Sequence, residues 1–117
     1  MARGVKSKSK SLWKVIVTEL RKRGLSFIIE PFASYMTNVR NVDPASCLES
    51  SPCLFYTIAK EYFNNDLEAA RFFINYLFSI VSPDKFSMRL EILKSMEECD
   101  DEKAKRLIRA LLNEITT

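Results

Sequence analysis

Residues 66–81, DLEAARFFINYLFSIV, decide the fold class of this chain. Asp66 is a preferred N-cap residue, and the polar side chains after it recur every three or four residues, as along one stripe of an α-helix. A helix that is apolar around most of its circumference must be buried on several sides. We therefore expect residues 67–81 to form the central helix of an all-α domain, or a helix that lies partly at an interface. The stripe consists of Glu68, Arg71, Asn75 and Ser79.

Helical patterns continue on both sides of this segment. Residues 11–24 begin with a candidate N-cap, Ser11, and end with Gly24, which suits the position just after a helix. Four prolines then occupy positions that suit the first residue of a helix, where the backbone N–H that proline lacks would have no partner inside the helix. They are Pro31, Pro44, Pro52 and Pro83, with Asp43, Ser51 and Ser82 as candidate caps before three of them. The predicted helices span residues 31–40, 44–49, 52–64 and 84–98, and a last helix follows Asp100 or Asp101.

These segments predict an all-α fold. We expect a single compact bundle of six or seven short helices over residues 11–117, preceded by a flexible, disordered basic tail at residues 1–10. Residues 25–30 form either a turn or the start of the second helix, since a strand there would have no partner. The segment from Asp66 also matches the segment from Asp101 at an offset of 35 residues, which suits helical-hairpin repeats. Any two capped amphipathic helices would match nearly as well, so a repeat remains one of two alternatives.

Basic residues are concentrated at the N-terminus. Residues 1–24 contain eight Lys and Arg side chains against Glu19 alone, which gives +7, whereas residues 25–117 carry −4. Three roles stay open for this segment: a solvated tail, a contact with nucleic acid or a nuclear-import signal, and a membrane-surface or mitochondrial targeting signal. The candidate nucleic-acid-binding residues are Lys6, Lys8, Lys10, Lys14, Arg21, Lys22 and Arg23.

The composition argues against several functional classes. The chain has no histidine, which is the commonest general base and metal ligand, and only two glycines, too few for a phosphate-binding loop. We therefore expect a non-enzymatic protein without catalytic, cofactor-binding or metal sites. The longest strongly apolar run without a charge, residues 72–83, is too short to span a bilayer, which requires ~20 residues.

The cysteines form an odd set without a CxxC spacing: Cys47, Cys53 and Cys99. Such a set resembles neither a zinc site nor a disulfide framework. The main expectation is buried or half-buried thiols in a reducing compartment, and a Cys47–Cys53 bridge across a short loop is the alternative. The sequence thus predicts an intracellular location, cytoplasmic or nuclear.

Aromatic residues carry the functional hypothesis. The chain has eight Phe, four Tyr and one Trp, concentrated in residues 55–63 and 72–78. Most of them should be core, but a small domain has few interior places for so many rings, and surplus aromatic side chains often mark protein–protein surfaces. We therefore expect an adaptor or regulatory module that docks a partner helix or a second copy of itself, as a homodimer. Its candidate protein-binding residues are Tyr56, Phe63, Phe72, Tyr76 and Phe78.

Helical spacing assigns each of these residues to a face. On residues 67–81 the polar stripe is expected to face water, which leaves Phe72, Tyr76 and Phe78 on the flanks. Tyr56 and Phe63 would line the same surface if an antiparallel hairpin turned through residues 64–66. The core side would then consist of Ala70, Phe73, Leu77 and either Ile80 or Val81.

Overall fold

Helices make up most of residues 11–116, the residues that the computed structural model describes. A 3₁₀ turn, η1 (Ser26–Ile28), precedes α3, and a π-helical turn, η2 (Tyr35–Val39), follows it. No strand occurs within these residues, so the prediction of an all-α bundle is confirmed, while the predicted basic tail at residues 1–10 lies outside them. The α-helices are α2 (Leu12–Lys22), α3 (Glu30–Ser34), α4 (Pro44–Ser50), α5 (Pro52–Tyr62), α6 (Leu67–Val81), α7 (Phe86–Glu97) and α8 (Asp101–Thr116).

Three helices begin at the caps that the sequence predicts. Ser11 Oγ, Asp43 Oδ2 and Asp66 Oδ1 each accept a hydrogen bond from the backbone N–H three residues later, at 3.1, 3.0 and 3.1 Å. These bonds satisfy N–H groups that the first turn of a helix leaves without an internal partner. Gly24 follows α2 with a φ of +72°, a value that glycine adopts without steric cost.

The start of α7 differs from the prediction. Pro83 lies in the turn between α6 and α7 instead of at the first helical position, and α7 begins at Phe86. Ser82 remains with α6, because its N–H and its hydroxyl both donate to Phe78 O, at 3.1 and 2.6 Å. The carbonyls of Ser82 and Pro83 then accept from Arg89 Nη1, at 2.6 and 3.3 Å. The buried Arg89 thus closes the C-terminus of α6, where a positive charge is favourable.

The start of α8 bears on the proposed repeat. Asp100 Oδ1 accepts from Lys103 N at 3.2 Å, so Asp100 caps α8 and Asp101 is its first residue. Asp66, which the repeat pairs with Asp101, is itself the N-cap of α6. The two aligned aspartates therefore hold different positions, and the offset of 35 residues does not superpose the two caps.

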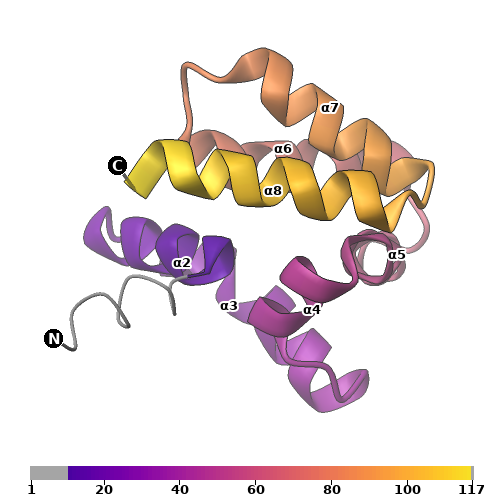
Figure 1. The fold of residues 1–117 in the computed structure, drawn as a ribbon. Coiled ribbons are helices and arrows are strands. Elements are labelled where there is room, and N and C mark those ends of the chain that lie inside the picture. Colours follow the sequence, from indigo (N-terminus) through magenta and orange to yellow (C-terminus); the bar gives the residue numbers. More distant parts are fainter. Residues whose placement is uncertain (1–10, 117) are drawn as a thin grey trace, which may run out of the picture.

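α6 is central to the packing of the helices. It packs against α2, α5 and α7, and α7 forms an antiparallel hairpin with α8 (Figure 1). The side chains that α6 buries are Ala70, Phe73, Ile74, Leu77, Phe78 and Ile80. Much of the aromatic content belongs to the core, because four rings contact Phe32 with centroids 5.1–6.3 Å away. These are the rings of Trp13, Phe55, Tyr62 and Phe73.

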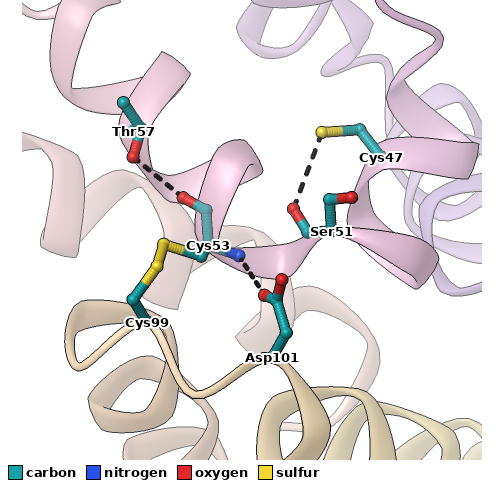
Figure 2. Close-up of a disulfide and its surroundings, with 6 residues drawn as sticks. All are labelled: Cys47, Ser51, Cys53, Thr57, Cys99 and Asp101. Carbon is teal, nitrogen blue, oxygen red and sulfur yellow. Dashed lines mark hydrogen bonds between the residues drawn. A yellow bond between two sulfur atoms is a disulfide. The ribbon is translucent and has the colours of Figure 1, made fainter.

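Cys53 and Cys99 form a disulfide, so the prediction of three free thiols is wrong. Figure 2 shows the bridge between the start of α5 and the turn that joins α7 to α8. Asp101 Oδ1 lies beside it and accepts from Cys53 N at 2.9 Å. The two cysteines are 46 residues apart in sequence, with Cα atoms 4.8 Å apart in space, so only the packing of the helices brings them together.

Cys47 keeps a free, buried thiol, so the alternative Cys47–Cys53 bridge is also wrong. Its Sγ lies 3.8 Å from Ser51 O, and burial raises the pKa of the thiol to about 11. Disulfides such as Cys53–Cys99 form and persist in oxidising environments. The cysteines therefore no longer support the reducing compartment from which an intracellular location was inferred.

Candidate functional site

Exposed apolar side chains are unevenly distributed over residues 11–116. Four of the six large ones lie on α6 and α7, two helices that pack directly against each other. The other two lie in η1 and η2. The six, with their exposed fractions, are Leu67 (45%), Phe72 (74%), Phe86 (57%) and Leu90 (45%), and Phe27 (67%) and Val39 (61%).

One stripe of α7 combines exposed apolar and charged residues. Phe86, Leu90 and Lys94 are exposed and spaced by four residues, so they lie along one side of the helix. Ile92 and Met96 are buried on the other side. We refer to Phe72, Phe86, Leu90 and Lys94 together as the α6–α7 surface.

Leu90 and Lys94 of the α6–α7 surface line a groove of about 570 Å³. Two of its lining residues, Leu90 and Leu93, are apolar and the others are charged. This combination matches the apolar centre and polar rim of protein interfaces. The complete lining is Arg71 of α6 together with Leu90, Leu93, Lys94, Glu97 and Glu98.

Glu97 anchors the groove to the rest of the molecule. Its carboxylate pairs with Arg71, whose Nη2 lies 3.1 Å from Oε1, and accepts from the Tyr56 hydroxyl at 3.2 Å. The hydrogen bond from Arg71 lowers the pKa of Glu97, whereas burial, followed by the charge of Glu97, raises the pKa of Tyr56 to about 12. The carboxylate therefore stays ionised and the phenol neutral around pH 7. These contacts connect α5, α6 and α7 at one end of the groove.

Arg89 fixes α7 against α6 further along the helix. Its Nε donates to Asn75 Oδ1 at 3.2 Å, in addition to the bonds that Nη1 makes at the end of α6. The guanidinium also lies 5.5 Å from the centroid of the Phe86 ring, within reach of a cation–π interaction. The buried Arg89 thus contacts the ring of Phe86, one apolar residue of the α6–α7 surface.

Two of the five predicted protein-binding residues are buried in the core. Tyr56 is 3% exposed and Phe78 is 1% exposed, so neither lines a surface, and this part of the prediction is corrected. The Tyr56 hydroxyl has a partner in the core because it donates a hydrogen bond to Glu97. Phe78 follows Arg71 by two helical turns, so it lies on the side of α6 from which Arg71 binds α7. Phe63 is half-buried against the ring of Phe73, at 5.2 Å between centroids.

The remaining two predicted residues, Phe72 and Tyr76, lie together on α6. Their rings stack with centroids 6.5 Å apart, and Tyr76 is half-buried whereas Phe72 is largely exposed. The sequence predicts that the polar stripe next to them faces water, but the structure shows that part of it does not. Arg71 and Asn75 instead bind side chains of α7, because α7 packs along that side of α6.

Phe86, Leu90 and Lys94 are candidates that the sequence reasoning missed. The signal for them is a second apolar side of the helix. Residues 86–97 bury Ile92 and Met96 on one side, and Phe86 and Leu90 lie on another. The periodicity does not show which side meets the core. Figure 1 shows α7 at the outer edge of the molecule, beside α6 and α8 and with one side uncovered.

The basic candidates within the described residues lie at α2. Lys14, Arg21, Lys22 and Arg23 are all exposed, and Lys14 and Arg21, seven residues apart, share one side of the helix. Glu19 offsets part of this charge through ion pairs with Lys22 at 4.0 Å and Arg23 at 3.2 Å. Arg23 Nη2 also donates to a backbone carbonyl of α6 at 3.4 Å. The remaining candidates, outside the described residues, are Lys6, Lys8 and Lys10.

Residues 11–116 were also compared with the requirements of a metal site and of a membrane span. This part of the chain has no group of three His, Cys, Asp or Glu side chains placed to hold a metal ion. None of its helices combines the length and the apolar composition that crossing a bilayer requires. Comparisons with protein families, curated proteins and solved structures found no match. The candidate sites are therefore the α6–α7 surface and the basic residues of α2.

Proposed function

We propose that this chain is a non-enzymatic helical interaction module that docks another protein chain on the α6–α7 surface. The observation that carries the proposal is the exposure of Phe72, Phe86 and Leu90 on two adjoining helices, together with a groove of about 570 Å³ that Leu90 lines. Single exposed apolar residues are common, but a group that includes aromatic rings and a charged rim is typical of protein-binding surfaces.

The charged groups of the groove support binding in preference to catalysis. Glu97, which has the most contacts among them, is held ionised by Arg71 and has a lowered pKa. A carboxyl that acts as a general acid or base near neutral pH needs a pKa raised towards that pH. Glu97 therefore serves to hold α5, α6 and α7 together, and Leu90 and Leu93 offer the apolar contact area.

Site-specific photo-crosslinking tests this function. A photoreactive phenylalanine analogue replaces Phe72 in one variant and Phe27 in a control, because both residues are exposed and only Phe72 belongs to the α6–α7 surface. The full chain is irradiated in an extract of the cells that make it, and each adduct is identified by mass spectrometry. We expect one recurrent protein adduct from position 72, which can be a second copy of the chain, and none from position 27.

Leu90→Glu should remove that adduct, and Val39→Glu, which alters an exposed apolar residue in η2, should leave it unchanged. Both substitutions are expected to change the free energy of unfolding by less than about 0.5 kcal/mol, as is usual on surfaces. The absence of any protein adduct at position 72, or equal labelling from positions 72 and 27, would overturn the proposed function.

Contact with nucleic acid is the second candidate function, and exposed basic residues on α2 support it. Lys14, Arg21 and Lys22 are available to phosphates, and neutralising phosphates requires only clustered Lys and Arg. Glu19 offsets part of this charge, so α2 supports nucleic-acid contact less strongly than the α6–α7 surface supports protein docking.

A further inference from the structure

The sequence around α7 has a symmetric pattern of side chains. In residues 84–94, DKFSMRLEILK, an acidic residue at one end, Asp84, corresponds to a basic residue at the other, Lys94. Nearer the middle, Phe86 corresponds to Leu90. The midpoints of both pairs fall at residues 88–89, so the pattern complements itself when the segment is reversed.

The structure exposes the members of this pattern. Phe86 and Leu90 are 57% and 45% exposed, and Asp84, Ser87 and Lys94 are also exposed. Within residues 11–116 neither Asp84 nor Lys94 takes part in an ion pair, although Asp84 lies close enough to Lys85 to raise its pKa. Ser87 lies near the centre and is small, so a second helix can approach α7 closely there.

We propose that a second copy of this chain occupies the α6–α7 surface, with the two α7 helices antiparallel about a two-fold axis near residues 88–89. This inference rests on the proposed function and names its partner. In a two-fold interface residue i meets residue j and residue j meets residue i. Phe86 of each copy then packs on Leu90 of the other, and Asp84 of each copy meets Lys94 of the other.

The two-fold arrangement also fills the groove. An α-helix rises 1.5 Å per residue, so Lys94, at the groove, lies about 8 Å from residues 88–89 along the axis of α7. The turn between α6 and α7 lies at about the same distance on the other side. Reversal therefore brings the exposed Pro83 and Asp84 of the second copy over the groove. Figure 1 shows this turn and the α7–α8 turn at opposite ends of α7.

The size of the contact indicates a weak dimer. α7 has 12 residues, so it is about 18 Å long, and one such helix pair with Phe72 at its flank provides less than the standard ~800 Å² per partner. Association should therefore depend on concentration and on the two charge pairs at its rim. A rim pair is worth little alone, but reversing one sign places like charges together twice in each dimer.

Charge reversal with mixing of variants tests the inference by sedimentation velocity at chain concentrations up to about 1 mM, low salt and neutral pH. Asp84→Lys alone places two lysines together, and Lys94→Asp alone places two aspartates together. Each single variant should associate at least about fivefold more weakly than the wild type. An equimolar mixture of the two single variants restores both ion pairs in the heterodimer, so association should recover. The double variant D84K/K94D should recover it as well.

Two results would overturn the dimer. One is a wild-type chain that stays monomeric up to about 1 mM, and the other is a mixture that associates no better than its components. Unchanged far-UV circular dichroism and thermal melts of the single variants show that a loss of association is not unfolding. A monomer that still forms one recurrent adduct with a different protein from position 72 would overturn this inference and retain the proposed function, whereas a chain that stays monomeric up to about 1 mM and also gives no adduct would remove both.

Discussion

Removal of the Cys53–Cys99 disulfide is expected to have a large effect on stability. The bridge joins residues 46 apart in sequence, and in the chain-entropy model closing a loop of that length stabilises the fold by about 4 kcal/mol at 25 °C, by restricting the unfolded chain. The variant C53S/C99S should therefore lose about 4 kcal/mol of unfolding free energy. It should still fold, because the bond from the backbone N–H at position 53 to Asp101 does not require a sulfur atom.

Urea denaturation followed by far-UV circular dichroism, with and without a thiol reductant, measures this loss. The wild type in reductant should match C53S/C99S, and the reductant should not affect the double variant. Cys47→Ala serves as the control, because it alters the free thiol and keeps the bridge, so it should remain sensitive to the reductant. A loss below about 1 kcal/mol, or a wild type whose stability the reductant does not change, would show that the bridge does not stabilise the fold in this way.

Three further perturbations test the helix contacts and the alternative function. Arg89→Met leaves two backbone carbonyls at the end of α6 without their donor, and urea titrations should show a loss of about 2–3 kcal/mol. Since Arg71 lowers the pKa of Glu97, this carboxylate stabilises the fold above its ordinary pKa of about 4.3, and the contribution disappears as pH falls through the lowered folded-state pKa. Glu97→Gln should therefore melt below the wild type at pH 7, with a difference that shrinks as the pH falls below about 4; a constant difference would contradict the ionised pair. If α2 binds nucleic acid, fluorescence anisotropy should show affinity for a DNA duplex that falls steeply between about 50 and 200 mM salt and weakens in R21A/K22A; salt-insensitive binding, or none at low salt, rejects that function.

Most helices could be predicted from the sequence because their signals are local. Asp66 caps α6 through a bond to a residue three positions away, and Gly24 follows α2 with the positive φ that the glycine suggests. Residues 25–30 contain both a turn and a helix start, as η1 and the first residue of α3. The error at Pro83 has a different origin, since the bonds that Arg89 makes to the end of α6 depend on how α7 packs.

The exposed faces could be predicted only in part, because a periodic pattern does not show which neighbour covers which side. Phe72 lies away from the core, as the sequence predicts, but Phe78, on the other flank of α6, is buried. The expected antiparallel hairpin places Tyr56 at the interface, yet Glu97, 41 residues later, accepts the hydrogen bond of its hydroxyl in the interior. The same limit applies to Cys53, whose partner lies 46 residues away and is recognisable only once α5 meets the α7–α8 turn.

Isotope-filtered NMR tests the central claim, docking of a second copy on the α6–α7 surface, most directly. In a mixture of ¹³C-labelled and unlabelled chains, the filter keeps only nuclear Overhauser effects between different molecules. We expect intermolecular effects between the Leu90 methyl groups and the Phe86 ring, which disappear in the Lys94→Asp variant alone and return on mixing with Asp84→Lys. Effects between Leu90 and Phe86 that are exclusively intramolecular, at concentrations approaching about 1 mM, would contradict it.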